Sequence, residues 1–321
     1  MTTNGAKSST VDAVIPVYRP GEEFTKLLGM LKAQDHPVRK IILMVTLPKG
    51  ETLPEIEGGE GVEVHTLSPS EFDHGGTRNQ GAACSDADYL MFLTQDAVPK
   101  DGKLVSALLS AFEDKKTGAA YARQIAREDA SIPERLTRSF NYPETARTQD
   151  ISTKERYGVK NYFLSNVASM YDRRVFESLG GFIDRTIFNE DMIFAYKLIS
   201  AGYSVRYVPE AVVLHSHRYT GKEEFRRNFD LGVSQADHPE IFESVSSEKE
   251  GVSMVKTVVK ALFRAGKFYL AVPFVYRSGM KYLGYRKGKN YRKLPKKKVY
   301  RYSLNKHYWE KYYGTDQSDT M

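Results

Sequence analysis

VDAVIPV, residues Val11–Val17, begins the pattern that decides the fold. A run of this length that is apolar except for Asp12 is typical of a strand that is buried on both faces. Helical spacing follows over residues 22–34, and a second apolar run follows over residues 40–45. Strand, helix and strand in this order predict two parallel strands joined by a helix.

The alternation continues outward along the chain. Further strands are predicted over residues 61–67, 87–94 and 119–123, and helices over residues 76–85 and 103–112. We therefore expect an α/β fold with a Rossmann-like, mostly parallel sheet and helices on both faces. Ligands bind such sheets beyond the carboxyl ends of the strands, so the polar residues after Leu93 become candidates for a site.

The remainder of the chain is less regular. Residues 128–160 are polar with little periodicity, which predicts a long loop or loose helices, a common place for an acceptor-binding lid. Beyond them we expect strands over residues 162–171, 203–208 and 211–214, and helices over residues 172–179, 190–201 and 222–235.

Charge is distributed unevenly over the 321 residues. The net charge is +7, and 16 of the 47 Lys and Arg residues lie within residues 252–309, which contain no Asp or Glu. The rest of the chain is therefore net acidic. This split predicts a basic tail that meets an anionic surface.

Cys84 is the single cysteine, which excludes an internal disulfide framework and fits a reducing compartment. The first ten residues are polar and do not resemble a signal peptide. No apolar run approaches the roughly 20 residues that a spanning helix needs. We therefore expect the chain in the cytosol or on the cytosolic face of a membrane.

Two motifs place carboxylates where chemistry is possible. In FLTQDAVP, residues 92–99, the predicted strand delivers Thr94, Gln95 and Asp96 to the sheet edge. A carboxylate there can hold a divalent cation, although Asp also favours turns. In GGFIDRTIFNED, residues 180–191, Glu190 and Asp191 fall on a first helical turn, where they stabilise the helix or act as a general base.

Two further motifs carry histidine and glycine. In LHSHRYT, residues 214–220, His215 and His217 point to the same side of an extended segment. Imidazole is a common metal ligand, although a lone histidine is more often structural. In FDHGGTRNQG, residues 72–81, a helix start offers N–H groups to an anion, and Arg78 can add a charged fork. A Gly-Gly turn before a helix is also common without a ligand.

Six motifs in this order and spacing resemble the family 2 glycosyltransferases of the GT-A fold. They are Val14–Tyr18, Thr77–Ala82, Leu93–Asp96, Gly180–Phe182, Glu190–Asp191 and His215–His217. The resemblance covers roughly residues 11–220. Within the family, Phe72–Asn79 and Leu93–Asp96 are most similar to the rhamnosyltransferases of bacterial polysaccharide synthesis. The resemblance implies inverting transfer of a sugar from a nucleotide donor.

The resemblance implies a role for each matching position. Asp191 would be the catalytic base, and Asp96 with His217 would hold a Mg²⁺ or Mn²⁺ ion. Gly181 and Glu190 would contact the acceptor or the donor sugar. The nucleotide and donor would be bound by Pro16, Tyr18, Thr46, Arg78, Gln95 and Asp96.

The chain departs from the family pattern at two places. Thr94 stands where the first Asp of the metal motif is usual, so His217 and the diphosphate would have to complete the metal site. Leu43–Thr46 lacks the acidic residue that commonly reads the base, which leaves uridine and thymidine both open. The resemblance implies dTDP-rhamnose as the donor, and an enzyme at a membrane would act on a lipid-linked saccharide as the acceptor. A UDP-hexose donor is the alternative.

The resemblance divides the chain into a GT-A catalytic domain, residues 1–240, and a basic helical tail, residues 241–321. An amphipathic helix is expected over residues 255–270, with Lys256, Lys260, Arg264 and Lys267 on one face and Val255, Val258, Val259, Leu262 and Phe263 on the other. This pattern is typical of an interfacial anchor on an anionic membrane.

The composition of the tail also fits three other interpretations. It could pack on the catalytic body with a solvated basic face. The tail could also bind nucleic acid, but this is disfavoured, because the rest of the chain is acidic and would not extend a basic groove beyond the tail. A non-catalytic scaffold is the alternative from another class of protein. We expect an enzyme peripheral to the inner face of the cell membrane.

Overall fold

In the part of the chain that the structure describes, nine strands form one sheet at the centre of the protein. The computed structural model describes residues 9–53, 56, 59–217, 219–242 and 247–314. Within them the strand order is β3-β2-β1-β4-β8-β6-β9-β5, and β7 pairs with β9. The strands are β1 (Val11–Val17), β2 (Lys40–Thr46), β3 (Val62–Leu67), β4 (Tyr89–Leu93), β5 (Val98–Pro99), β6 (Thr117–Ile125), β7 (Arg147–Gln149), β8 (Ala168–Asp172) and β9 (Ser204–Leu214).

The N-terminal half of the sheet confirms the expected α/β arrangement. β3, β2, β1 and β4 are parallel neighbours. The other half is mixed, because β8 is inserted antiparallel between β4 and β6, whereas β9 runs parallel to β6. The carboxyl ends of the parallel strands therefore share one edge with the end of β9.

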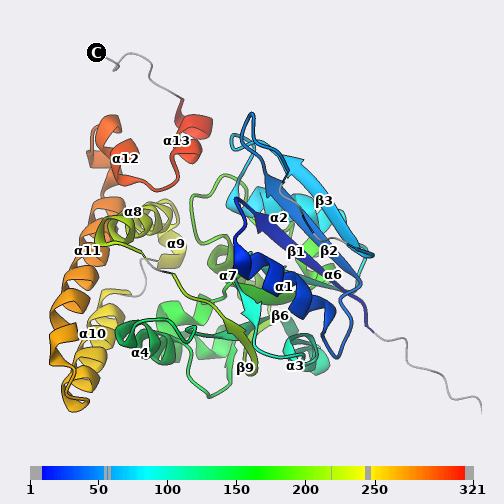
Figure 1. Ribbon diagram of the computed structural model, residues 1–321, viewed down its shortest axis with the longest axis horizontal. Helices are drawn as coiled ribbons and strands as arrows, with labels where there is room; N and C mark the ends of the chain where they lie inside the picture. Colours follow the sequence, from blue (N-terminus) through cyan, green and yellow to red (C-terminus); the bar gives the residue numbers. More distant parts are fainter. Residues whose placement is uncertain (1–8, 54–55, 57–58, 218, 243–246, 315–321) are drawn as a thin grey trace, which may run out of the picture.

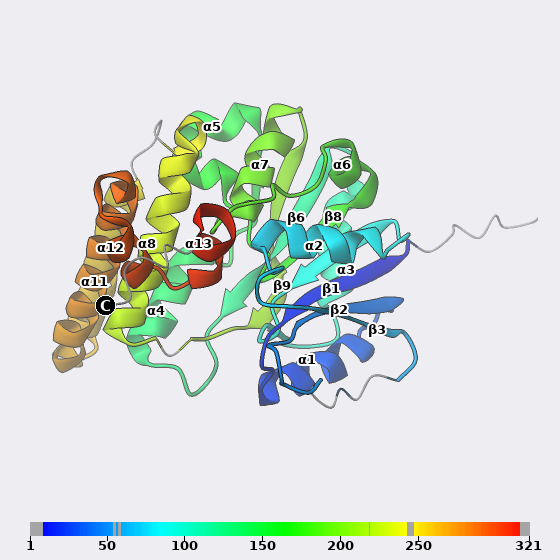
Figure 2. The same cartoon turned by 90° about the horizontal axis from the view of Figure 1, so that it is seen from above.

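Helices cover both faces of the sheet. Ile15 of β1 packs with Leu27 of α1 (Glu22–Lys32) on one face of the sheet. The preceding residue, Val14, belongs to the hydrophobic cluster on the opposite face. On that face Gly81 of α2 (His74–Ala83) lies so close that a Cβ would be 2.4 Å from Cγ1 of Val14. Figure 2 shows α1 on one side of the sheet and α2, α6 (Arg173–Ser178) and α7 (Glu190–Ser200) on the other.

The strand expected over residues 162–171 is wrong for most of its length. Only residues 168–172 form β8, and residues 158–162 form a 3-10 helix. The buried side chain of Gln149 donates from Nε2 to the carbonyl oxygens of Lys160, Asn161 and Phe163, at 3.1, 3.0 and 2.8 Å. These carbonyl groups therefore accept their hydrogen bonds from a side chain and not from the backbone of a neighbouring strand.

The segment over residues 128–160 is more regular than expected. It contains α4 (Ile132–Asn141), β7 and α5 (Lys154–Tyr157). Ser131 caps α4 by accepting a hydrogen bond from the Glu134 backbone N–H, and a proline lies in the first turn. The apolar pattern did not reveal α4 because none of its residues is buried.

Helices from the last hundred residues stack beside the sheet (Figure 1). They are α8 (Gly221–Asp237), α9 (Pro239–Phe242), α10 (Ser247–Arg264), α11 (Ala271–Lys289), α12 (Lys296–Tyr302) and α13 (Lys306–Tyr313). α11 packs along α8, and α10 packs on α4. Trp309 of α13 is buried in a cluster with Phe229 and Val233 of α8.

The amphipathic helix of the tail ends earlier than expected, at Arg264 and not at residue 270. Gly266 has a φ of +68°, and the Lys267 N–H donates to the Leu262 carbonyl oxygen at 2.9 Å, which closes the helix end. A 3-10 turn, Phe268–Leu270, then leads into α11.

The expected apolar face of α10 is divided between two environments. Val258 and Leu262 are buried against Ile132 and Leu136 of the α4 helix, as the packed alternative predicts. Phe263 is 62% exposed. Among the described residues, the helices are all too short or too polar to span a bilayer. The domain boundary at residue 240 stays a prediction.

Candidate active site

Asp96, His215 and His217 form a cluster whose donor atoms lie within 4.8 Å of one another. Asp96 follows β4 and precedes β5, whereas the two histidines follow β9. β5 pairs antiparallel with the end of β9, with Val98 opposite Leu214. This pairing brings the Asp96 carboxylate to 3.5 Å from Nε2 of His215 and 3.5 Å from Nδ1 of His217.

The cluster has the donor set of a metal site. Nδ1 of His215 lies 3.0 Å from Oε1 of Gln124, an acceptor, so Nδ1 carries the proton and Nε2 presents its lone pair. That buried Nε2 has no hydrogen-bond partner among the described residues. Burial lowers the pKa of His217 to about 3, and it also lowers the pKa of His215. Both imidazoles are therefore neutral, the form that binds a cation.

Two adjacent carboxylates begin α7 and differ in their partners. Glu190 forms an ion pair with Arg78, Oε1 to Nη1 at 3.2 Å, and both side chains are buried. Asp191 accepts hydrogen bonds from the backbone N–H groups of Asn166, at 3.0 Å, and Met192, at 2.8 Å. Asn189, the residue before α7, has a φ of +64° and gives no side-chain cap.

The partners set the protonation of each carboxylate in opposite directions. Although burial opposes it, the charge of Arg78 lowers the pKa of Glu190. Burial and the negative charge of Glu190 raise the pKa of Asp191 to about 7. Asp191 is therefore a stronger base than an ordinary carboxylate, and it changes charge near neutral pH.

A cavity of about 750 Å³ joins these groups. Asp191, Glu190, Arg78, His215 and His217 line it, whereas Asp96 contacts both histidines but is not among the lining residues. Its walls come from α4, the segment before β8, the start of α7, α8 and α11. The cavity therefore brings together four of the predicted site residues, which come from three separate motifs: Arg78, Glu190, Asp191 and His217.

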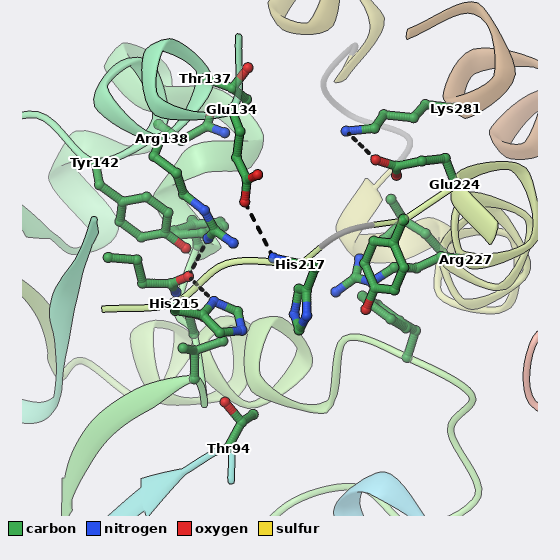
Figure 3. A pocket seen from close by; sticks show the side chains of 18 of the residues that line it. Thr94, Glu134, Thr137, Arg138, Tyr142, His215, His217, Glu224, Arg227 and Lys281 are labelled. Carbon is green, nitrogen blue, oxygen red and sulfur yellow. Dashed lines mark hydrogen bonds and ion pairs between the residues drawn. The ribbon is translucent and has the colours of Figure 1, made fainter. Parts of the chain in front are cut away.

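Several side chains that line the cavity were not predicted from the sequence as parts of a site. Glu134 and Arg138 come from α4, and Arg227 comes from α8. In the view of Figure 3, His217 lies between Arg138 on one side and Arg227 on the other. The signals for α4 were present in the sequence, since a capping serine, a proline and a glutamate follow one another at residues 131–134.

Four of the predicted nucleotide-binding residues, Pro16, Tyr18, Thr46 and Gln95, lie at the carboxyl edge of the parallel strands, whereas Arg78 lies on α2 and lines the cavity. Gln95 clamps the turn after β1, because its Oε1 accepts from the Tyr18 N–H at 2.7 Å and its Nε2 donates to the Tyr18 carbonyl at 2.9 Å. Pro16 belongs to β1 and Thr46 ends β2, where it is buried. None of these four residues is among those lining the 750 Å³ cavity.

The glycine motifs have structural explanations. Asp73 caps α2 and already accepts from the N–H groups of Gly75 and Gly76, at 3.1 and 2.9 Å, so the expected anion site at that helix start is wrong. Gly181 is buried with a φ of +65°, and a Cβ there would lie 2.8 Å from Oδ1 of Asn79. It shapes the loop before α7, and its expected contact with a sugar stays a prediction.

Comparisons with known proteins bear on this site. The model of glycosyl transferase family 2 matches residues 12–180. The O-antigen chain rhamnosyltransferase RfbN of Salmonella typhimurium is 36% identical, over 93% of this chain and 96% of the relative. The O-antigen chain rhamnosyltransferase WbaN of Salmonella anatum is 38% identical, over 92% and 94% respectively.

Solved structures share the fold at low sequence identity. The mannosyltransferase PcManGT of Pyrobaculum calidifontis, in complex with GDP-Man and Mn²⁺, matches with a TM-score of 0.57 at 13% identity, over 88% of this chain and 87% of the other. Residues 1–349 of TarS from S. aureus, in complex with UDP-GlcNAc, match with a TM-score of 0.50 at 14% identity, over 88% and 92%. These likenesses show the GT-A fold.

Proposed function

This chain belongs to glycosyl transferase family 2, and from that premise we propose that it is an inverting rhamnosyltransferase of cell-surface polysaccharide synthesis. Two relatives named as O-antigen chain rhamnosyltransferases, aligned over more than nine-tenths of the chain, support rhamnose as the sugar. One observation carries the proposal: the Asp191 carboxylate and the His217 imidazole line the same cavity.

Asp191 is the base of the proposed reaction. Its carboxylate is held by two backbone N–H groups, so it faces the cavity in a fixed orientation. It takes the proton from an acceptor hydroxyl, and that oxygen attacks the anomeric carbon of the donor sugar. The bond from this carbon to the diphosphate breaks in the same step, which inverts the anomeric configuration.

Asp96, His215 and His217 are the proposed ligands of a divalent cation. Two imidazoles and one carboxylate favour Mn²⁺ over Mg²⁺, which prefers oxygen ligands. When bound, the cation neutralises charge on the departing diphosphate. Arg138 and Arg227, on either side of His217, add positive charge from the protein itself (Figure 3).

The donor is proposed to be dTDP-rhamnose, with its nucleotide at the carboxyl edge of β1, β2 and β4. Pro16, Tyr18 and Thr46 would surround the base and ribose, where the Gln95 clamp orders the turn after β1. The diphosphate would extend from this edge towards His217. A UDP-hexose is the alternative donor, and the base-reading position on β2 leaves both nucleotides possible.

The acceptor is proposed to be a lipid-linked saccharide at the inner face of the cell membrane. Apolar side chains around the α10–α11 turn are more than half exposed, namely Phe263, Phe268, Tyr269, Val272 and Tyr276. Basic residues surround them, as at an interfacial anchor. This surface would hold the cavity close to the lipid-linked acceptor.

A transfer assay tests the proposal. The purified chain is incubated with Mn²⁺, a lipid-linked saccharide and either dTDP-rhamnose or UDP-glucose, and the product is identified by mass spectrometry and its anomeric configuration by NMR. We expect rhamnosylated product with inverted configuration, and its loss when a chelator removes the metal. Retained configuration, or transfer from UDP-glucose alone, would overturn the proposal.

Asp191→Asn provides the matched control. The amide keeps the shape of the side chain but cannot accept the proton, so we expect the rate to fall by about 10²–10⁴-fold. Donor binding, followed as the thermal shift caused by dTDP, should persist. Full activity of this variant would remove Asp191 from the mechanism.

A further inference from the structure

Helix α11 presents two different faces. Pro273, Phe274, Arg277, Ser278 and Lys281 line the 750 Å³ cavity. Other side chains of the same helix are exposed and apolar, with exposed fractions of 75% for Val272, 60% for Tyr276 and 52% for Leu283. One helix therefore carries cations on the cavity side and an apolar surface beside them.

The two cations of α11 share one carboxylate. Nζ of Lys281 lies 3.2 Å and Nη2 of Arg277 lies 3.5 Å from Oε1 of Glu224 on α8. Nη2 of Arg277 also donates to the Tyr219 carbonyl oxygen at 2.6 Å. Each cationic side chain keeps 39% of its surface exposed, whereas that of Glu224 keeps 9%. The carboxylate is thus covered, and the cations are accessible from the cavity.

A third cation adds to this wall. Arg227 lies one turn after Glu224 on α8 and lines the same cavity. Its guanidinium lies over the ring of Phe188, 4.7 Å from the centroid. In the part of the chain that the structure describes, no ion pair joins Arg227 to a carboxylate. Three cations against one carboxylate leave this wall positively charged, which suits a multiply charged anion.

We propose that Arg277 and Lys281 bind the phosphate group that joins the acceptor saccharide to its lipid. This inference rests on the proposed function and names the acceptor as a phosphate- or diphosphate-linked saccharide. The planar fork of Arg277 fits two phosphate oxygens, and the ammonium of Lys281 adds a point charge. Glu224 holds both side chains in place before the acceptor binds.

The position of these cations favours the acceptor over the donor as their ligand. The donor diphosphate is assigned to the cluster of Asp96, His215 and His217, which is built on β4 and β9. Arg277 and Lys281 are on the helix that also bears the exposed apolar surface. A lipid-linked phosphate meets both requirements at once, since its lipid is next to the phosphate and its saccharide extends into the cavity.

Kinetics with two acceptors test the inference. The first is the saccharide linked through diphosphate to a short, soluble prenyl chain, and the second is the same saccharide as a phosphate-free alkyl glycoside. Both are assayed in neutral detergent, which excludes anionic lipid headgroups. For Arg277→Gln and Lys281→Gln, we expect KM for the diphosphate acceptor to rise about tenfold or more. KM for the alkyl glycoside and for the donor should not change.

Lys287→Gln is the matched control, because Lys287 is an exposed cation of α11 outside the cavity lining. It should change neither KM. Arg277→Lys should restore part of the affinity for the diphosphate acceptor. Each single variant leaves Glu224 one cationic partner, and thermal melting checks that it folds.

Equal effects on the two acceptors, or no effect on either, would overturn the inference. If Lys287→Gln matched the other variants, general charge and not this site would be responsible, which also overturns it. Transfer of rhamnose to the alkyl glycoside by the unsubstituted enzyme tests the proposed function independently of the phosphate site, because that reaction does not need a phosphate. If neither acceptor were rhamnosylated, the proposed function itself would fail.

Discussion

Glu190 and Asp191 are neighbours in the chain, but their surroundings give them different chemistry. Glu190 is balanced by Arg78, and it stays charged although it is buried. Among the described residues, no Lys or Arg forms an ion pair with Asp191, and burial together with the charge of Glu190 raises its pKa. The base of the proposed reaction therefore needs Glu190 and Arg78 even if neither touches a sugar.

The raised pKa of Asp191 predicts a pH dependence. A base must be ionised to accept a proton, so kcat/KM should be low below the pKa of about 7 and should rise as the pH increases through it. Initial rates between pH 5 and 9 measure this profile. Glu190→Gln removes the negative charge next to Asp191 and should lower the pKa of Asp191. The increase of kcat/KM should therefore occur at lower pH.

The unsubstituted enzyme measured in parallel is the reference for that shift. A rate that is constant from pH 5 to 8 would contradict the assignment of Asp191 as the base. A shift of the Glu190→Gln profile to higher pH would contradict the stated effect of the Glu190 charge.

At the scale of elements, α8 and α11 are held together by glycines. A Cβ on Gly284 would lie 2.1 Å from the Phe225 carbonyl oxygen, and one on Gly288 would lie 2.0 Å from that of Phe229. The two helix backbones therefore touch where no side chain would fit. This contact fixes α11, and with it Arg277 and Lys281, against the cavity.

Gly284→Ala tests this packing. The methyl group would meet backbone atoms, which cannot rotate away, so we expect destabilisation of about 1–3 kcal/mol or more. The control is Gly279→Ala on the same helix, where nothing lies within 4 Å of an added Cβ. It should be neutral, or stabilising by up to about 1 kcal/mol. Urea denaturation followed by circular dichroism measures both, and equal stabilities would contradict the packing argument.

Elements were predictable from the sequence where their apolar pattern is strong. β1, β2 and α1 fall close to the expected residues, because their buried side chains recur at strand or helix spacing. α4 was missed because it has no buried residue. The strand predicted over residues 162–171 began too early, because the local pattern does not record that Gln149 binds the carbonyl groups of residues 160, 161 and 163.

For the whole molecule, the α10–α11 turn predicts membrane binding. Phe263 and Phe268 are each 62% exposed. We expect the protein to cosediment with vesicles that contain anionic lipid, and less so at high salt. Replacing both phenylalanines with serine should weaken binding by roughly tenfold or more, because each loses apolar area that would enter the lipid.

Ile151→Ser is the control for that measurement, since Ile151 is 65% exposed but lies outside the tail. It should bind vesicles as the unsubstituted protein does. Equal loss of binding in the control, or unchanged binding in the double variant, would contradict a membrane-facing role for the turn.

From the amino-acid pattern alone we could predict the α/β class, the parallel strands and the positions of Asp96, Asp191 and His217 at the ends of elements. Each of these depends on local spacing, because burial repeats with the period of a strand or a helix. Packing in three dimensions determined that β5 pairs with β9 and joins Asp96 to the histidines. It likewise decided that Arg78 balances Glu190, and that α4 and α11 complete the cavity. These contacts connect residues far apart in the chain, and no local pattern records which distant partner will neutralise a buried charge.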